Sequence, residues 1–359
     1  MNKKFNHLID MDDYTVSHWN AIIGLAQDIM RRPDSYSDKC SGRIMATLFY
    51  EQSTRTQMSF QAAMIRLGGS IIGFDNPSNS SVAKGENLKD TIKIVSSYSD
   101  ILVMRHTSEG SARAAALAAD CPVINAGDGG HLHPTQTLTD LLTLKTELGR
   151  LDNLTVGLCG DLKYGRTVHS LLKALSCYPN NKFILISTES LSLPSYIKDV
   201  LSARGCEFRE VRTIDEAMPE LDMLYMTRIQ RERFDSEEEY KRQKDVYKLT
   251  PAKMRLAKKE MIVMHTLPRV NEIEVEVDDD PRAAYFRQAL NGMYVRMALI
   301  LTTLNNEPSC KPLLTGVIHK DVCCSNKKCV TQTELYLPHS FRKFGDILIC
   351  EYCDERILL

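Results

Sequence analysis

The chain has 359 residues, and its 45 Lys and Arg nearly balance its 46 Asp and Glu, leaving a net charge of −1. This balance gives no general attraction to nucleic acid or to a membrane surface. No apolar run approaches the ~20 residues needed to span a bilayer, and the first ten residues lack the apolar core of a signal peptide. We therefore expect a cytoplasmic protein that has neither nucleic acid nor a membrane as a partner.

Short apolar runs along the chain predict buried parallel strands, and helical patterns separate them. In one such helix, Leu88, Ile92 and Val95 form a single apolar stripe. Strands that alternate with helices predict an α/β fold with two doubly wound parallel sheets. The predicted strands are residues 44–50, 101–104, 122–124, 155–158, 183–186, 223–226 and 261–264.

Polar or charged residues directly follow six of these predicted strands. In an open parallel sheet, ligands bind beyond the carboxyl ends of the strands. The loops that follow the strands are therefore predicted to carry the functional site. These loops begin near residues 51, 105, 127, 160, 227 and 265.

The first of these loops contains Ser53, Thr54, Arg55 and Thr56 between a predicted strand and a predicted helix. A hydroxyl at a helix start usually caps the helix, which explains one of the three hydroxyls but not the arginine. Helix N-terminal amides, hydroxyls and a guanidinium together suit a phosphate group. The loop is therefore predicted to bind an anion.

The same loop, followed by Ser59 and Phe60, resembles the carbamoyl-phosphate motif of the aspartate and ornithine carbamoyltransferases. Ornithine enzymes carry a His-Cys-Leu-Pro motif, whereas this chain has Thr266 after His265, which favours the aspartate branch. The resemblance extends from about residue 6 to residue 305. Further segments that resemble the family are residues 79–91, 131–136, 265–273 and 280–300.

The resemblance implies transfer of the carbamoyl group of carbamoyl phosphate to the amine of L-aspartate, giving N-carbamoyl-L-aspartate and phosphate. It implies no cofactor for catalysis. It also implies a carbamoyl-phosphate-binding domain at residues 1–134, with the helix at 285–305 packing back on it, and an aspartate-binding domain at residues 135–284.

Site residues are implied by matching positions in this sequence. The catalytic residues are Arg55, Thr56, Arg105 and His133. The carbamoyl-phosphate-binding residues are Ser53, Thr54, Arg55, Thr56, Arg105, His133, Gln136, Leu267 and Pro268. The aspartate-binding residues are Lys84, Arg166, Arg228 and Gln230.

The resemblance further implies that Ser80 and Lys84 reach the site of a neighbouring subunit, so that the chain forms a homotrimer or a multiple of it. Glu51 is expected to orient Arg105. Pro268 is expected to follow a cis peptide. Two departures from the family pattern, Gln57 and Thr266, remove no residue assigned to the chemistry.

Near the end of the chain, Cys324-x4-Cys329 and Cys350-x2-Cys353 form two knuckles about twenty residues apart. Four thiolates on two tight turns suit a structural Zn²⁺ ion, which would supply folding energy to a short module. The other cysteine of the pair, Cys323, is expected to be a spare thiol.

This tail resembles the zinc domain of the regulatory chain of bacterial aspartate carbamoyltransferase. The expected module is a small β-rich zinc domain at residues 311–359. Only eighteen residues separate Asn305 from Cys324. Because an effector-binding domain needs far more chain, no regulatory nucleotide site is expected.

Two alternatives remain open from the sequence. One is a transcarbamylase that acts on another amino acid, such as ornithine. The other is an inactive scaffold whose tail is a nucleic-acid-binding zinc ribbon. The inactive scaffold is disfavoured because the chain has all the arginines and the histidine that the family's chemistry uses, namely Arg55, Arg105, His133, Arg166 and Arg228.

Overall fold

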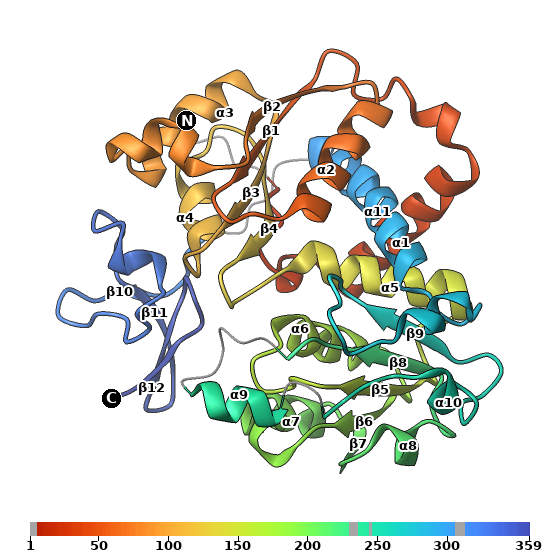
Figure 1. The fold of residues 1–359 in the computed structure, drawn as a ribbon. Coiled ribbons are helices and arrows are strands. Elements are labelled where there is room, and N and C mark those ends of the chain that lie inside the picture. The colour runs from red at the N-terminus through yellow and green to blue at the C-terminus, as the bar shows by residue number, and fades with distance from the viewer. Residues whose placement is uncertain (1–5, 230–235, 244–245, 306–312) are drawn as a thin grey trace. The chain divides into compact units, whose positions relative to one another are not determined.

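The computed structural model describes residues 6–229, 236–243, 246–305 and 313–359 (Figure 1). It divides into two compact units. Unit 1 comprises Met1–Thr135 and Met293–Leu359, and unit 2 comprises Gln136–Gly292. No helix in the described ranges is long and apolar enough to cross a membrane.

Unit 1 is built on a four-stranded parallel sheet of order β2-β1-β3-β4. The strands are β1 (Ile44–Phe49), β2 (Ser70–Phe74), β3 (Ile101–His106) and β4 (Val123–Asp128). The helices around this sheet are α1 (Val16–Arg31), α2 (Thr54–Arg66), α3 (Leu88–Tyr98) and α4 (Ser111–Ala118). Short 3-10 turns are Met11–Asp13, Pro33–Tyr36, Pro77–Asn79 and Ser81–Lys84.

Local sequence explains how these helices begin. At α3 the Asn87 side chain accepts a 2.9 Å hydrogen bond from the Asp90 backbone amide, which satisfies one of the free amides of the first turn. The predicted apolar stripe then faces inward, because Leu88 and Ile92 are buried. Helix α2 differs: its N-cap residue Ser53 makes no capping hydrogen bond.

Unit 2 is built on a five-stranded parallel sheet of order β7-β6-β5-β8-β9. The strands are β5 (Thr155–Cys159), β6 (Lys182–Ile186), β7 (Glu207–Val211), β8 (Met223–Met226) and β9 (Ile262–His265). The helices are α6 (Arg166–Leu175), α7 (Ser195–Ala203), α8 (Ile214–Ala217), α9 (Glu237–Gln243) and α10 (Pro251–Met254), with 3-10 turns at Glu189–Leu191 and Val275–Asp279. Two further helices, α5 (Pro134–Leu148) and α11 (Tyr285–Asn305), contribute residues to both units.

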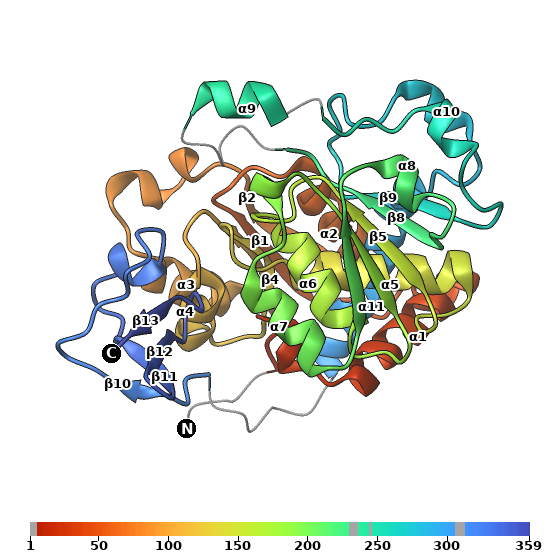
Figure 2. The ribbon, with the colours of Figure 1, turned by 90° about the horizontal axis from the view of Figure 1, so that it is seen from below.

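The C-terminal part of unit 1 is a small antiparallel sheet of order β10-β11-β12-β13. Its strands are β10 (Val317–Ile318), β11 (Ser340–Phe344), β12 (Ile347–Cys350) and β13 (Arg356–Leu358), with a 3-10 turn at Val330–Gln332. We call residues 313–359 the C-terminal module. In Figures 1 and 2 it lies beside α4 of the same unit.

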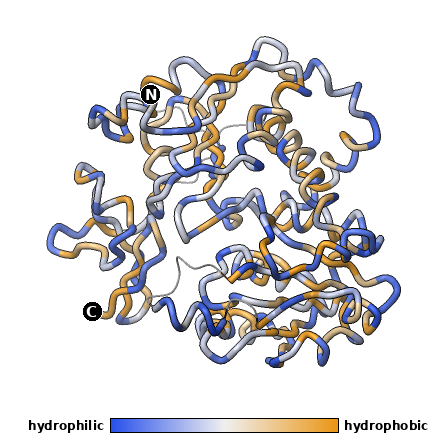
Figure 3. Tube along the Cα trace, in the orientation of Figure 1, coloured by the Kyte–Doolittle hydropathy of each residue, from blue (hydrophilic) through white to orange (hydrophobic). Residues whose placement is uncertain are grey.

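The expected fold class is confirmed: the chain has two parallel-sheet α/β bodies and a small β-rich domain. Figure 3 shows hydrophobic stretches within both units, and the central strands are mostly buried. Two strands of the parallel sheets, β2 and β7, were absent from the sequence prediction. Both lie at a sheet edge, and most of their residues are exposed or half-buried, so neither forms a continuous apolar run.

Candidate active site

The predicted anion-binding residues of unit 1 lie at the carboxyl edge of its parallel sheet. Residues 53–56 follow β1 and open helix α2, and Arg105 lies at the end of β3. The Ser53 hydroxyl donates a 3.0 Å hydrogen bond to Thr56 Oγ1 rather than capping the helix. The first amides of α2 are thus left without this side-chain cap, which suits a helix N-terminus that receives an anion.

Two arginines of this edge interact as like charges. Burial, and then repulsion by Arg105, lower the pKa of Arg55. Among the described residues, no acidic side chain forms an ion pair with Arg55. A bound anion would relieve the repulsion between the two guanidinium groups.

Arg105 is buried, and its guanidinium group is held by residues that belong to or follow the two neighbouring strands, β1 and β4. Its NH2 atom donates a 2.8 Å hydrogen bond to Glu51 Oε1, and its NH1 atom donates to the Ala126 carbonyl at 3.3 Å. Its Nε atom is buried without a hydrogen-bond partner. The Glu51–Arg105 contact expected from the sequence is present, and one donor of the guanidinium group remains unpaired.

His133 belongs to the same unit and is buried, with 6% of its surface exposed. It follows β4 through the segment 128–132, and its Nδ1 atom lies 3.5 Å from the Thr135 hydroxyl. The neighbouring His131 contacts two carboxylates, Asp128 through Nδ1 and Asp354 through Nε2, each at 3.1 Å. Burial alone would lower the pKa of His131, but the carboxylates outweigh this and raise it to about 10.

The segment that holds Ser80 and Lys84 is a pair of 3-10 turns on the surface of unit 1. Ser80 donates a 2.8 Å hydrogen bond to the Pro77 carbonyl and accepts one from the Val82 amide at 3.3 Å. Lys84 is exposed.

Unit 2 holds the other residues predicted to bind the substrates. The Gln136 amide nitrogen donates to Asp140 at 2.8 Å, and Asp140 also accepts from Gln288 at 2.7 Å and from the Tyr225 hydroxyl at 2.8 Å. Asp140 therefore fixes the amide group of Gln136. Sequence reasoning missed Asp140, although its four-residue spacing from Gln136 inside an apolar helix was a usable signal.

The predicted aspartate-binding arginines follow two neighbouring strands of the unit 2 sheet. Arg166 is the first residue of α6, after β5, and Arg228 follows β8 by two residues. Both side chains are half-buried. Because β5 and β8 are adjacent and parallel, their carboxyl ends lie at the same edge of the sheet. The third predicted residue, Gln230, lies outside the described residues.

The segment after β9 forms a defined turn. The Leu267–Pro268 peptide is cis, as expected, and Leu267 has φ of 53°. The Leu267 amide donates to His265 Nδ1 at 2.7 Å, while His265 Nε2 lies 2.8 Å from Glu272. Burial would raise the pKa of Glu272, but hydrogen bonds from His265 and from the Val270 amide hold it at about 2.

The four predicted metal ligands converge within the C-terminal module. The sulfur atoms of Cys324, Cys329, Cys350 and Cys353 all lie within 4.8 Å of one another, and all four residues are buried. Two of the sulfur pairs, Cys324–Cys353 and Cys329–Cys350, lie 3.5 Å and 3.9 Å apart. These distances exceed an S–S bond and match the ~3.8 Å separation that a tetrahedral ion with ~2.3 Å bonds to sulfur requires.

The surroundings of the cluster also fit a metal ion. The Thr331 hydroxyl donates to Cys329 Sγ at 3.2 Å. The adjacent Cys323 is exposed and stands outside the cluster. The four cysteines can hold a metal ion.

Comparison with known proteins covers most of the chain. Residues 6–146 match the sequence model of the aspartate/ornithine carbamoyltransferase carbamoyl-P binding domain, and residues 152–303 match that of the Asp/Orn binding domain. The chain belongs to the aspartate/ornithine carbamoyltransferase family. The matched residues end before the cysteine cluster, so this family assignment does not include the C-terminal module.

Two curated relatives within the family are bacterial. The aspartate carbamoyltransferase catalytic subunit of Clostridium perfringens strain SM101 is 58% identical over 302 residues, which are 84% of this chain and 98% of the relative. The corresponding subunit of Clostridium novyi strain NT is 57% identical over 301 residues, again 84% of this chain and 98% of the relative.

Solved structures in the family agree. The catalytic subunit of M. jannaschii aspartate transcarbamoylase has a TM-score of 0.79 at 45% identity, covering 83% of this chain and 98% of that one. Aspartate transcarbamoylase from Trypanosoma cruzi, solved with N-(phosphonacetyl)-L-aspartic acid, has a TM-score of 0.78 at 42% identity. The match covers 84% of this chain and 96% of that one.

Proposed function

We propose that the chain transfers the carbamoyl group of carbamoyl phosphate to the amine of L-aspartate, in the synthesis of pyrimidines. The observation that carries this proposal is the 58% identity, over 302 residues, to a subunit named for this activity. The two arginines of unit 1, one without an acidic partner among the described residues, support an anionic substrate at that position.

In the proposed reaction, the amine nitrogen of aspartate attacks the carbonyl carbon of carbamoyl phosphate. The new C–N bond forms as the bond from that carbon to the phosphate oxygen breaks, and a proton from the amine leaves with the phosphate. Ser53, Thr54, Arg55 and Thr56 hold the phosphate. Cationic and hydrogen-bonding groups held in advance at the developing oxyanion account for most of the rate gain.

Other proposed roles follow the chemistry of each side chain. Arg105, His133 and Thr56 stabilise the oxyanion on the carbamoyl group. Gln136 binds the carbamoyl amide. The backbone carbonyls of Leu267 and Pro268 accept hydrogen bonds from the attacking amine.

The second substrate brings two carboxylates, which planar guanidinium groups bind well. Arg166 binds the α-carboxylate, and Arg228 with Gln230 binds the side-chain carboxylate. We propose that Ser80 and Lys84 act in the site of a neighbouring subunit, with Lys84 contacting aspartate, so that the working form is a homotrimer or a multiple of it. The cytoplasm is the proposed compartment.

The cysteine cluster is proposed to bind Zn²⁺ through Cys324, Cys329, Cys350 and Cys353. When bound, the ion supplies folding energy to the module and takes no part in carbamoyl transfer. The fit of the four buried sulfur atoms to tetrahedral coordination supports this assignment.

The test compares initial rates with L-aspartate, L-ornithine and N-acetyl-L-ornithine as acceptors, at equal carbamoyl phosphate. The proposal expects turnover with aspartate alone. Turnover with ornithine alone would place the chain in the other branch of the family. Absence of turnover with all three acceptors would contradict the proposed activity itself.

A further inference from the structure

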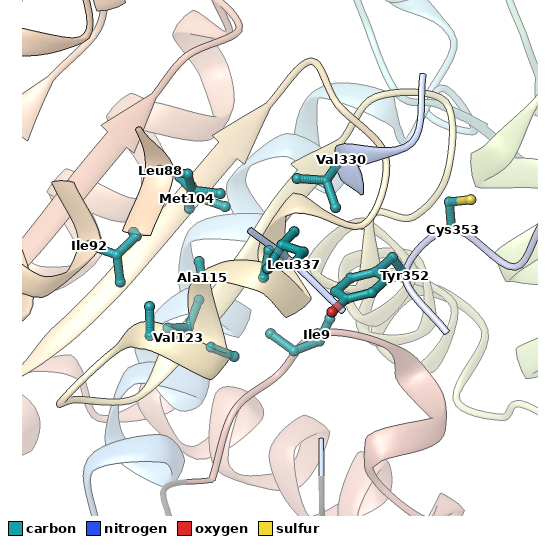
Figure 4. Close-up of a cluster of buried hydrophobic side chains, with 14 of the residues drawn as sticks. Ile9, Leu88, Ile92, Met104, Ala115, Val123, Val330, Leu337, Tyr352 and Cys353 are labelled. Atoms are coloured by element: carbon teal, nitrogen blue, oxygen red, sulfur yellow. The ribbon is translucent and has the colours of Figure 1, made fainter. Parts of the chain in front are cut away.

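The C-terminal module shares a hydrophobic core with the rest of unit 1. Tyr352, Val330 and Leu337 of the module lie in one buried cluster with Ala115 of α4 and Met104 of β3 (Figure 4). The contact extends to the backbone. Gly110 has φ of +84°, and a Cβ atom placed there would collide with the Cβ atom and backbone of Tyr352. The module is therefore docked closely on the loop between β3 and α4.

The first cysteine knuckle reaches the 128–132 segment through Glu109. Asn326, inside the knuckle, donates a 2.7 Å hydrogen bond to Glu109 Oε2, while Glu109 Oε1 accepts from the Gly130 amide at 3.1 Å. The backbone of Glu109 also pairs with the knuckle, through Lys328 O and Val330 N, each at 2.9 Å. One carboxylate thus links the knuckle to the segment before His133.

The second knuckle reaches the same segment through His131. Asp354 directly follows Cys353, and its Oδ2 atom lies 3.1 Å from His131 Nε2. The other ring nitrogen of His131 contacts Asp128, whose second oxygen accepts from the Leu132 amide at 3.0 Å. Because Asp128 is almost completely buried, this link is held in a fixed position.

Both links end on residues 128–132, and His133 is the next residue along the chain. Each link begins at a knuckle turn, one at Asn326 between Cys324 and Cys329, the other at Asp354 beside Cys353. Thiolates that close such turns around a metal ion hold them rigid, and the turns open when the ion leaves. Loss of the ion would therefore release both links together.

We propose that the metal-loaded module positions the 128–132 segment, and through it His133, with Glu109, His131 and Asp354 as the positioning residues. This inference rests on the proposed function, because it concerns a group assigned to the oxyanion site. The module would thus affect catalysis without contacting the substrate. The module acts by restricting the segment to the arrangement that His133 needs.

The test changes Asp354, which has φ of 58°, a conformation that glycine and asparagine adopt readily. Asp354→Gly removes the carboxylate without backbone strain, and Asp354→Asn keeps an oxygen that accepts from His131. The control is Arg342→Ala, since Arg342 is the half-exposed partner of the other Asp354 oxygen, at 3.0 Å. Zinc content and amide hydrogen exchange are measured for every variant.

We expect Asp354→Gly to keep its zinc, to raise the KM for carbamoyl phosphate and to lower kcat, for a combined loss of roughly tenfold in kcat/KM. Amide exchange at residues 129–132 should rise in the same variant. In Asp354→Asn, kcat/KM and the amide exchange at residues 129–132 should both return most of the way to the values of the unaltered protein. Arg342→Ala should match the unaltered protein in both.

Unchanged kinetics and exchange in Asp354→Gly, with zinc retained, would overturn the proposal. Loss of zinc with faster exchange throughout residues 313–359 would also overturn it, since that pattern shows unfolding rather than positioning. The exchange measurement needs no turnover. Failure of the proposed carbamoyl transfer would appear in the acceptor assay, while the exchange at residues 129–132 would still report whether the module holds the segment.

Discussion

Arg55 and Arg105 lie close enough for Arg105 to lower the pKa of Arg55, and only Arg105 has an acidic partner among the described residues, Glu51 at 2.8 Å. Because Glu51 pairs with Arg105 and not with Arg55, one positive charge is left unbalanced at the carboxyl edge of the unit 1 sheet. This charge and the uncapped start of α2 support the proposal that an anion binds at this edge.

Replacing Arg55 by alanine should therefore damage catalysis far more than folding. The change removes a charge from the phosphate and relieves a repulsion, so we expect kcat/KM to fall by about 10²–10³ while the melting temperature stays the same or rises. Steady-state kinetics and thermal melting check this. Arg66, exposed at the end of the same helix, is the matched control, and Arg66→Ala should retain full activity. Equal turnover by Arg55→Ala and Arg66→Ala would refute the assignment.

Glu51 should affect catalysis by holding the guanidinium group of Arg105 in place. Glu51→Gln keeps an oxygen that accepts the 2.8 Å hydrogen bond but removes its charge, so we expect roughly a tenfold loss of kcat/KM. Glu51→Ala should lose more, because the buried guanidinium would then have no partner on that side. The two variants are compared with the unaltered protein in the same assay. Identical losses in both would show that the orientation of Arg105 does not depend on this hydrogen bond.

The sequence predicts the central strands well because buried parallel strands are short apolar runs. Of these, β8 was predicted to the residue at Met223–Met226. The edge strands β2 and β7 were missed because most of their side chains are exposed or half-buried and form no continuous apolar run. The anion loop was predicted because its arginine has no role in capping a helix.

Other parts of the site have no local signal in the sequence. Glu109 and His131 are ordinary polar residues until the fold brings residues 326 and 354 beside them, more than 200 positions further along the chain. Asp140 likewise depends on Tyr225 and Gln288, which reach it only in the folded unit. Contacts of this kind follow from tertiary packing, which a pattern of neighbouring residues does not encode.

The adjacent cysteines Cys323 and Cys324 should behave differently. Cys324 is buried in the four-sulfur cluster and Cys323 is exposed outside it. Cys324→Ser should bind less than one zinc per chain and lose the folded module, since metal binding stabilises such small domains by about 10–16 kcal/mol. Cys323→Ser should keep one zinc per chain. Metal analysis and proteolysis of the module measure both outcomes, and equal zinc in the two variants would remove Cys324 from the ligand set.

The pKa of Glu272, lowered to about 2, makes part of the stability depend on pH. A carboxylate with a depressed pKa stabilises the fold fully above its ordinary value near 4.5, and this contribution is lost as the pH falls toward 2. Glu272→Gln should therefore lower the free energy of unfolding at pH 7 by about 1–3 kcal/mol. The difference from the unaltered protein should shrink below pH 4.5.

Urea unfolding at pH 7, 5 and 4 checks this dependence. Glu274→Gln is the control, because Glu274 forms only a half-exposed ion pair with Lys248 at 2.9 Å. It should change stability little at any of these pH values. A Glu272→Gln effect that is the same at every pH would show that the charge of Glu272 does not stabilise the fold.

The most direct measurement of the proposed activity follows the carbamoyl carbon itself. The unaltered protein and Arg55→Ala are each given carbamoyl phosphate labelled with ¹³C, together with L-aspartate and L-ornithine in one mixture, and the products are followed by NMR. The account predicts that the label appears in N-carbamoyl-L-aspartate with the unaltered protein. With Arg55→Ala the same product should form roughly a hundredfold more slowly. Label that appears in citrulline, or that appears in N-carbamoyl-L-aspartate equally fast with both proteins, would contradict it.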